Sequence, residues 1–137
     1  MIVVASWDHV RRIALALPES SERSSRRLAS WWVRDKLFVW ERPLRPADVR
    51  ALRDRAPTGP ILGARVPHLG AKEALLADDP GVFFTTPRFD GYLAILIRLE
   101  EISVEDPEEI IVEAWLTRAS KRLAREYVAT HLPPQSG

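Results

Sequence analysis

The chain has 137 residues, of which 46% are hydrophobic and 28% charged, and its formal net charge is +1. These values are typical of one folded globular domain and exclude a disordered chain. The absence of cysteine excludes disulfides, thiolate catalysis and Cys-based metal sites. We expect a single domain over residues 1–132 and a flexible tail over 133–137. Because the apolar start, residues 1–5, is too short for a signal peptide or a membrane span, we expect a cytoplasmic protein without membrane contact. The sequence leaves the oligomeric state open, and a monomer is favoured.

The N-terminal part of the chain is predicted to form a helix and then a β-hairpin. Ser6 is suited to cap a helix over residues 7–17, because apolar residues recur there at helical spacing and a proline ends the run. Residues 19–25 are a polar connection or the entry to a strand. The hairpin is expected to join Arg26–Val33 to Leu37–Arg42 around a compact, charged tip.

Alternation along this hairpin predicts which side chains share a face of the sheet. Phe38 and Trp40 are expected on one face, and Leu37 and Val39 on the opposite one. A sheet with apolar residues on both faces needs a covering layer on each side, or it leaves one face as a binding surface.

Proline and glycine divide the middle of the chain into short elements. A helix is predicted over residues 46–55, with proline in its first turn and with Val49 and Leu52 facing inward. A strand is predicted over residues 61–66. Within it, Gly63 indicates either a bulge or a close approach of another group.

The most apolar stretch is predicted to form the core hairpin. After a short helix over residues 71–77, a strand over 82–86 is rich in aromatic and β-branched residues. Residues 86–91 have turn composition, including proline and Asp-Gly. Residues 92–99 carry one charge in eight and are expected to form an interior strand that is covered on both faces.

A helix is predicted near the C-terminus. Asp106 is suited to be its N-cap and Pro107 its first residue. Basic residues accumulate over 118–125, where they either complement the dipole of this helix or contact a ligand. We leave open whether the segment is one long helix or breaks near Ser120.

Several segments match one known family. They are Leu15–Glu19, Trp32–Phe38, Phe83–Pro87, Gly91–Leu99, Glu113–Trp115 and Lys121–Leu123. With these motifs the sequence resembles the MmcQ/YjbR family of small bacterial proteins, which are commonly labelled DNA-binding. The resemblance covers nearly the whole chain. It implies an α+β fold similar to that of bacterial frataxin-like proteins, with an N-terminal helix, a largely antiparallel sheet of about five strands and a C-terminal helix packed on the sheet.

No motif indicates a metal, a cofactor or catalysis. His9, His68 and His131 lack metal-ligand spacing, and the glycines form no phosphate-binding loop. Frataxin-like proteins bind iron through an acidic first helix, whereas this one carries two arginines and a single aspartate. His68 is either a site residue or a solvated turn histidine. We therefore expect a protein that is not an enzyme and binds no metal or organic cofactor.

The residues that suit a ligand are basic or aromatic and lie near predicted loops. Residues 1–65 hold 13 Lys and Arg against 7 Asp and Glu, a net of +6, and residues 66–137 hold 7 against 12, a net of −5. Such asymmetry accompanies nucleic-acid binding, but it also arises when two halves of a domain neutralise each other. Arginine matches phosphate geometry, and exposed aromatic rings stack on bases. The predicted nucleic-acid-binding residues are Arg26, Arg27, Arg34, Lys36, Arg88 and Phe89.

Two functions of different classes are left open. The first is a non-enzymatic DNA-binding module whose arginines on hairpin loops contact phosphates. The second is a protein-interaction or chaperone-like module that uses an exposed sheet face or edge. A positive surface that joins the hairpin loops would favour the first, and an exposed apolar patch with a polar rim would favour the second.

Overall fold

The structure, a computed structural model, describes residues 5–103 and 107–131. The structure confirms the predicted α+β fold with an antiparallel sheet. The sheet has six strands in the order β1-β2-β3-β4-β6-β5. The strands are β1 (Ser20–Ser25), β2 (Leu28–Val33), β3 (Lys36–Glu41), β4 (Ile61–Arg65), β5 (Phe83–Phe84) and β6 (Ala94–Arg98). The α-helices are α1 (Trp7–Ala16), α2 (Pro46–Leu52), α3 (Leu69–Asp78), α4 (Pro107–Arg118) and α5 (Lys121–His131). The short 3₁₀ helices are η1 (Arg53–Arg55), η2 (Pro87–Phe89) and η3 (Leu99–Glu101). The expected N-cap Asp106 and the expected tail, 133–137, lie outside the described residues.

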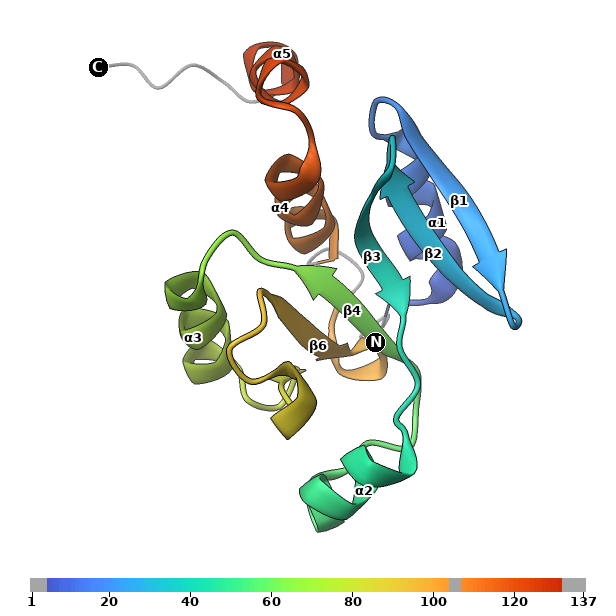
Figure 1. Ribbon diagram of the computed structural model, residues 1–137, viewed down its shortest axis with the longest axis vertical. Helices are drawn as coiled ribbons and strands as arrows, with labels where there is room; N and C mark the ends of the chain where they lie inside the picture. The colour runs from blue at the N-terminus through green and yellow to red at the C-terminus, as the bar shows by residue number, and fades with distance from the viewer. Residues whose placement is uncertain (1–4, 104–106, 132–137) are drawn as a thin grey trace.

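Two helices cover one face of the sheet and enclose the main core. Helix α1 lies against β1 and β2, and α4 lies against β3 and β4 (Figure 1). Trp31, Ile95, Ile111 and Trp115 meet between them with at most 1% of their surface exposed. Burying each such side chain stabilises the fold by about 1.5–3 kcal/mol. This face therefore supplies much of the stability.

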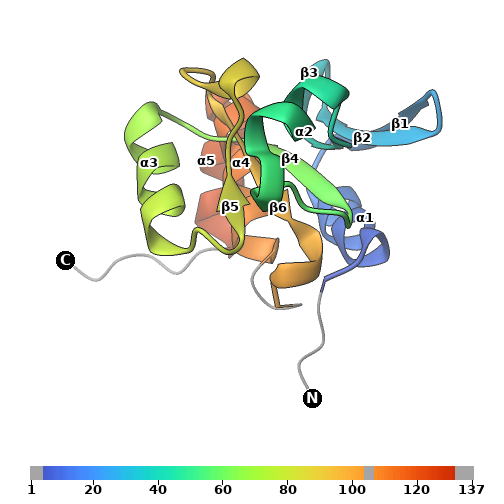
Figure 2. The same cartoon turned by 90° about the horizontal axis from the view of Figure 1, so that it is seen from below.

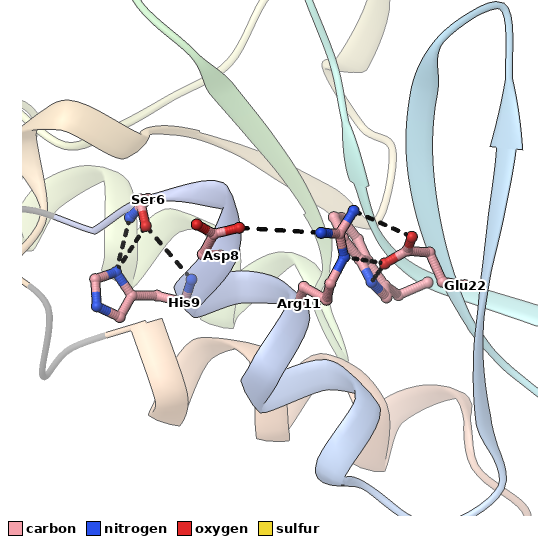
Figure 3. Close-up of polar contacts among 6 residues, drawn as sticks. Ser6, Asp8, His9, Arg11 and Glu22 are labelled. Atoms are coloured by element: carbon pink, nitrogen blue, oxygen red, sulfur yellow. Dashed lines mark hydrogen bonds and ion pairs between the residues drawn. The ribbon is translucent and has the colours of Figure 1, made fainter.

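A polar network fixes α1 to the sheet (Figure 3). Ser6 caps the helix as predicted, and its backbone N–H donates to His9 Nδ1 over 3.1 Å. Glu22 on β1 accepts hydrogen bonds from Arg11 Nε at 2.8 Å and from Trp31 Nε1 at 2.9 Å. Helix, edge strand and core are thus joined at one carboxylate.

The polar segment before the first hairpin is a strand. Residues 20–25 form β1 at the edge of the sheet, which raises the strand number from the expected five to six. Ser25 pairs with Leu28, so Arg26 and Arg27 are the central residues of a two-residue turn. Their φ angles are 52° and 66°, the left-handed values that a type I′ hairpin requires. The predicted strand start at Arg26 is wrong because these residues form the turn.

A β-bulge interrupts alternation in the second hairpin. The register between β2 and β3 shifts after Trp31, where β3 contains one extra residue. As a result Phe38 and Val39 both lie fully buried in the main core. Trp40 packs against a second cluster instead. The prediction that Phe38 shares a face with Trp40 is therefore wrong, because the bulge adds a residue that alternation cannot anticipate.

The other face of the sheet is only partly covered. Its second cluster of buried residues comprises Leu52, Ile61, Phe84, Phe89, Ala94 and Leu96. Helix α2 and η2 approach each other over this side. In α2, Leu52 is buried as predicted, but Val49 is 47% exposed and Asp48 faces inward. The reason is that Asp48 pairs with a buried arginine described below, and this pair sets which side of α2 faces the protein.

Strand β6 lies between β4 and β5 in the sheet. The predicted interior strand is therefore confirmed, although it begins at Ala94.

The C-terminal part of the chain forms two separate helices. Helix α4 ends at Arg118, and Ser120 Oγ accepts a hydrogen bond from the first turn of α5. The helical segment therefore breaks near Ser120. Tyr127 of α5 packs on Trp115 with ring centroids 5.1 Å apart. Within the described residues, every helix is too short or too polar to cross a bilayer.

Candidate functional site

A cleft of about 780 Å³ opens on the partly covered face of the sheet. It lies between the β2–β3 hairpin, the segment that leads into α2, and the η2 loop. Three features define it: an apolar and aromatic floor, several arginines, and one acidic neighbour, Glu41. Its lining residues are Leu28, Leu37, Trp40, Glu41, Arg42, Pro43, Leu44, Arg45, Pro46, Arg88, Phe89 and Tyr92. Its volume falls in the usual range for ligand sites, about 300–1,000 Å³.

The floor of the cleft contains a tryptophan that lies flat on the sheet. Trp40 pairs with Gly63 of β4, and a Cβ atom at position 63 would overlap the Trp40 indole. Of the two meanings predicted for Gly63, close approach is therefore the correct one. Since Trp40 also lines the cleft, its indole provides an apolar surface there.

An exposed tyrosine stands beside this floor. Tyr92 is 49% exposed, whereas the sequence predicted it within a buried strand. Arg65 Nη1 donates to its hydroxyl at 2.7 Å, and the Arg65 guanidinium lies 5.0 Å from its ring centroid. Phe89 meets the same ring edge-on at 5.9 Å. The Tyr92 ring is thus held in place while half of it faces solvent.

A buried ion pair builds the wall of the cleft. Arg42 Nη2 lies 3.0 Å from Asp48 Oδ2, and both residues are at most 6% exposed. Burial raises the pKa of Asp48, but hydrogen bonds from the Arg45 backbone and from Arg42 outweigh this and lower the pKa below its ordinary value. The Arg42 guanidinium also lies 5.2 Å from the Phe89 ring. The pair therefore joins the end of β3 to α2 and to η2.

A buried lysine supports the η2 loop from behind. Lys72 of α3 is 4% exposed, and its Nζ donates to the carbonyl oxygens of Phe89 and, at 2.9 Å, Tyr92. Desolvation lowers the pKa of Lys72, although nearby Asp90 acts in the opposite direction. These bonds occupy the ammonium group, so Lys72 positions the cleft wall.

The predicted arginines lie at opposite ends of β2. Arg26 and Arg27 form the β1–β2 turn, next to Leu28 in the cleft. Arg34 is beyond the other end, a separation of about 20 Å for a six-residue strand. Its guanidinium makes two hydrogen bonds to Glu19, of 2.9 and 3.1 Å. The paired Arg34 and the two turn arginines thus lie at opposite ends of one strand, and their shared role in nucleic-acid binding stays a prediction.

The remaining predicted site residues lie at or next to the cleft. Arg88 is exposed and lines the cleft, and Lys36 is exposed and directly precedes Leu37, which also lines it. Phe89 lines the cleft but is only 8% exposed, so the interpretation of its ring as an exposed stacking surface is wrong. The η2 turn directs this ring into the second cluster, where Arg42 covers it.

Pairing with acids separates the basic residues further. In the described part of the chain, Arg26, Arg27, Arg45 and Arg88 have no carboxylate within ion-pair distance. All four are exposed. Arg45 and Arg88 line the cleft, and Arg26 and Arg27 directly precede Leu28, which also lines it. The cleft thus has a positively charged rim.

Sequence reasoning missed Trp40, Tyr92 and Arg45 as site residues. The Arg42–Asp48 pair had a local signal, because an aspartate at the third position of the expected helix is suited to bond the N-terminal backbone. Tyr92 had none, because it directly adjoins an apolar strand. His68 accepts a hydrogen bond from Ala71 N at 3.0 Å and caps α3, which gives it a structural role.

The basic end of the chain has a different position from the one expected. Lys121 and Arg122 lie in the first turn of α5, at the positive end of its dipole, so they do not complement a helix dipole. Helix α5 lies at the opposite end of the molecule from α2 (Figure 1). Across the described residues, no three His, Asp or Glu side chains gather where they could hold a metal ion. The expected absence of metals and cofactors stays a prediction.

Three mycobacterial proteins are similar to this chain over almost their whole length. They are the uncharacterised proteins Mb2600 of Mycobacterium bovis and MT2646 and Rv2570 of Mycobacterium tuberculosis. Each is 50% identical over 129 residues, which cover 92% of this chain and 98% of the relative. Their names assign no activity.

A solved structure is similar in fold. The crystal structure of Deinococcus radiodurans protein DR2400, described as a DUF419 domain, superposes with a TM-score of 0.64. The two sequences are 14% identical, and the match covers 90% of this chain and 88% of the other. At this identity the likeness shows the fold alone. No family model matches the chain.

Proposed function

This chain belongs to the same family as the three uncharacterised mycobacterial proteins, and on that premise we propose that it is a non-enzymatic nucleic-acid-binding protein of the MmcQ/YjbR type. The observation that carries the proposal is the cleft, whose exposed arginines lack acidic partners in the described residues. Arginine without a carboxylate partner is free to bind phosphate. The proposal also agrees with the DUF419 fold, which is related to that of MmcQ/YjbR proteins.

The β1–β2 turn supports the proposal independently. A type I′ turn favours Asn-Gly, because both central residues need positive φ. Here Arg26 and Arg27 occupy these positions at a conformational cost of about 1–2 kcal/mol per residue. Packing offers no compensation, since both are exposed. The turn therefore presents two charges at the expense of stability, which is expected of a contact site.

The test is a salt titration of DNA binding by fluorescence anisotropy. We expect dissociation constants of ~10⁻⁴–10⁻⁶ M at physiological salt and a slope of log affinity against log salt of roughly −3 to −4.5, for three to five phosphate contacts. The variant R26N/R27G removes both charges and installs the favoured turn residues. It should make the slope shallower by about two, and the fold should be retained or strengthened.

A matched control removes the same charge elsewhere. The variant R122A/R125A changes two exposed arginines on α5 and should leave the slope unchanged. If instead the α5 variant loses the slope and the turn variant keeps it, the contact surface lies on α5. If wild-type protein binds neither duplex nor single-stranded DNA at low salt, the proposal is wrong.

A protein-interaction module is the second candidate, and one observation favours it. Strand β1 is at the edge of the sheet, and among the described residues β2 is its one strand partner. An exposed edge can accept an extended peptide as an additional strand. Because its side chains are Ser, Glu and Arg, such binding would rely on the backbone. Failure of DNA binding together with a peptide that protects β1 amides from hydrogen exchange would favour this function.

A further inference from the structure

Resting on the proposed function, we propose that the cleft selects a single-stranded polynucleotide over a duplex, with unpaired bases on its aromatic floor. The proposal rests on where the apolar surface and the charges lie relative to each other. The aromatic floor of the cleft, its rim of arginines and the different surfaces of a single strand and a duplex support the proposal.

The floor offers flat aromatic surface that is already in position. The Trp40 indole rests on Gly63, and the Tyr92 ring is fixed by Arg65 and Phe89. Lys72 also holds the backbone carbonyl of Tyr92. Because these groups are ordered without a ligand, a base would stack on them with little loss of side-chain freedom.

A neighbouring tryptophan shows the contrast. Trp32 lies on the same face, but the Arg23 guanidinium covers its ring at 4.1 Å and its Nε1 donates to Ser30 Oγ at 2.8 Å. Contacts within the protein thus already occupy the Trp32 ring. The rings of Trp40 and Tyr92 are left to line the cleft.

The rim places positive charge around this apolar floor. Arg45 precedes α2 on one wall and Arg88 belongs to η2 on another. The Arg26–Arg27 turn is adjacent to Leu28, and Leu37 pairs with Trp32, four residues or about 13 Å further along β2. A strand across the cleft would have phosphates near the arginines and bases toward the leucines and aromatic rings.

A duplex satisfies only part of this arrangement. It presents phosphates and base edges outward, whereas its base faces are stacked inside. It could contact the rim arginines but would leave the apolar floor without a partner. A single strand exposes base faces, and every base has one, so this binding tolerates sequence variation.

The experiment compares labelled oligo(dT), oligo(U) and a DNA duplex of equal length by anisotropy at one salt concentration. Oligo(dT) or oligo(U) should bind at least about tenfold more tightly than the duplex. Loss of one stacking contact costs about 1–3 kcal/mol, so Y92A should weaken single-strand binding about 5- to 150-fold and duplex binding hardly at all. The two single-stranded probes distinguish DNA from RNA as the preferred source of unpaired bases.

The control variant is Y92F, which keeps the ring and removes the hydroxyl that Arg65 contacts. It should retain single-strand binding, and near-UV circular dichroism should confirm that both variants remain folded. Equal or tighter binding of the duplex would overturn this inference but leave the proposed function intact. Unchanged single-strand binding by folded Y92A would also overturn it. Binding of none of the probes would defeat the proposed function and this inference together.

Discussion

The two faces of the sheet carry similar residues but differ in how far these residues are buried. On the face covered by α1 and α4, Trp31 and Trp115 are buried to 1% exposure or less. On the other face, Trp40 and Tyr92 line an open cleft, and Tyr92 is half exposed. Both faces are aromatic, so composition does not distinguish them. The difference is that helices of the same chain cover one face and reach only part of the other (Figure 2).

Charge follows the same division. On the covered side Arg11 is matched by Glu22, which also accepts a hydrogen bond from Trp31. Around the cleft, exposed Arg45 and Arg88 have no carboxylate partner among the described residues. The exposed arginines of the cleft therefore differ from Arg11, whereas the buried Arg42 in the same cleft wall is paired with Asp48.

The largest expected effect is on the covered face. Ile95 of β6 is fully buried in the main core, and I95A should lower the free energy of unfolding by ~2–5 kcal/mol, because it leaves a cavity. Urea denaturation at neutral pH measures this change. The control V49A truncates an exposed valine on α2 and should stay within about 0.5 kcal/mol of wild type. Equal losses in the two variants would contradict the division between the faces.

A smaller effect is expected in acid. The hydrogen bond from Arg11 is the main cause that holds the pKa of Glu22 below its ordinary value in the folded protein, and desolvation partly opposes it. Because the folded pKa is the lower one, this stabilisation is fully present above the ordinary glutamate pKa, about 4.3, and is lost as the pH falls through the folded value. Urea midpoints measured across this range should therefore fall as acid is added.

The variant E22Q isolates this contribution. It keeps an oxygen that can accept from Trp31 and removes the charge that Arg11 meets. Since the Arg11 side chain is about half exposed, solvent screening keeps the effect on stability at neutral pH small. The acid dependence should become shallower in E22Q. An unchanged pH profile would mean that Arg11 and Glu22 are not coupled in solution.

The sequence predicted the elements better than their contacts. The capped first helix, the interior strand β6 and the α+β class follow from local patterns of apolar spacing, capping and turn residues. The β-bulge does not, because it depends on how two strands settle against the core. Consequently the faces of Phe38 and Trp40 were predicted wrongly.

The candidate site was predicted only in part, for a related reason. Arg88 and Phe89 were identified from the turn composition of their loop, and both line the cleft. Arg26 and Arg27 are separated from Arg34 because the two turns occupy opposite ends of β2, and pairing of Arg34 with Glu19 depends on tertiary structure. Sequence identifies the residue types that suit phosphate, but only the fold shows which of them an acid already occupies.

The smallest expected effect tests that last point. Arg34 makes two hydrogen bonds to Glu19, and both side chains are about half exposed. Exposed ion pairs contribute about 0–1 kcal/mol, so R34A should change stability by no more than that. Ala retains the positive φ of this turn, so the backbone strain is similar in both proteins. Because Arg34 is already paired with Glu19, the salt slope of DNA binding should also stay within error.

The variant E19Q makes the opposite test of the same pair. It leaves Arg34 exposed without its carboxylate partner, and a free arginine can add at most one phosphate contact, about −0.9 in the salt slope. We therefore expect E19Q to leave the slope unchanged or to make it steeper, whereas R26N/R27G makes it shallower. If R34A weakened binding as strongly as the turn variant does, pairing with an acid would not decide which arginines bind, and the two ends of β2 would be equivalent.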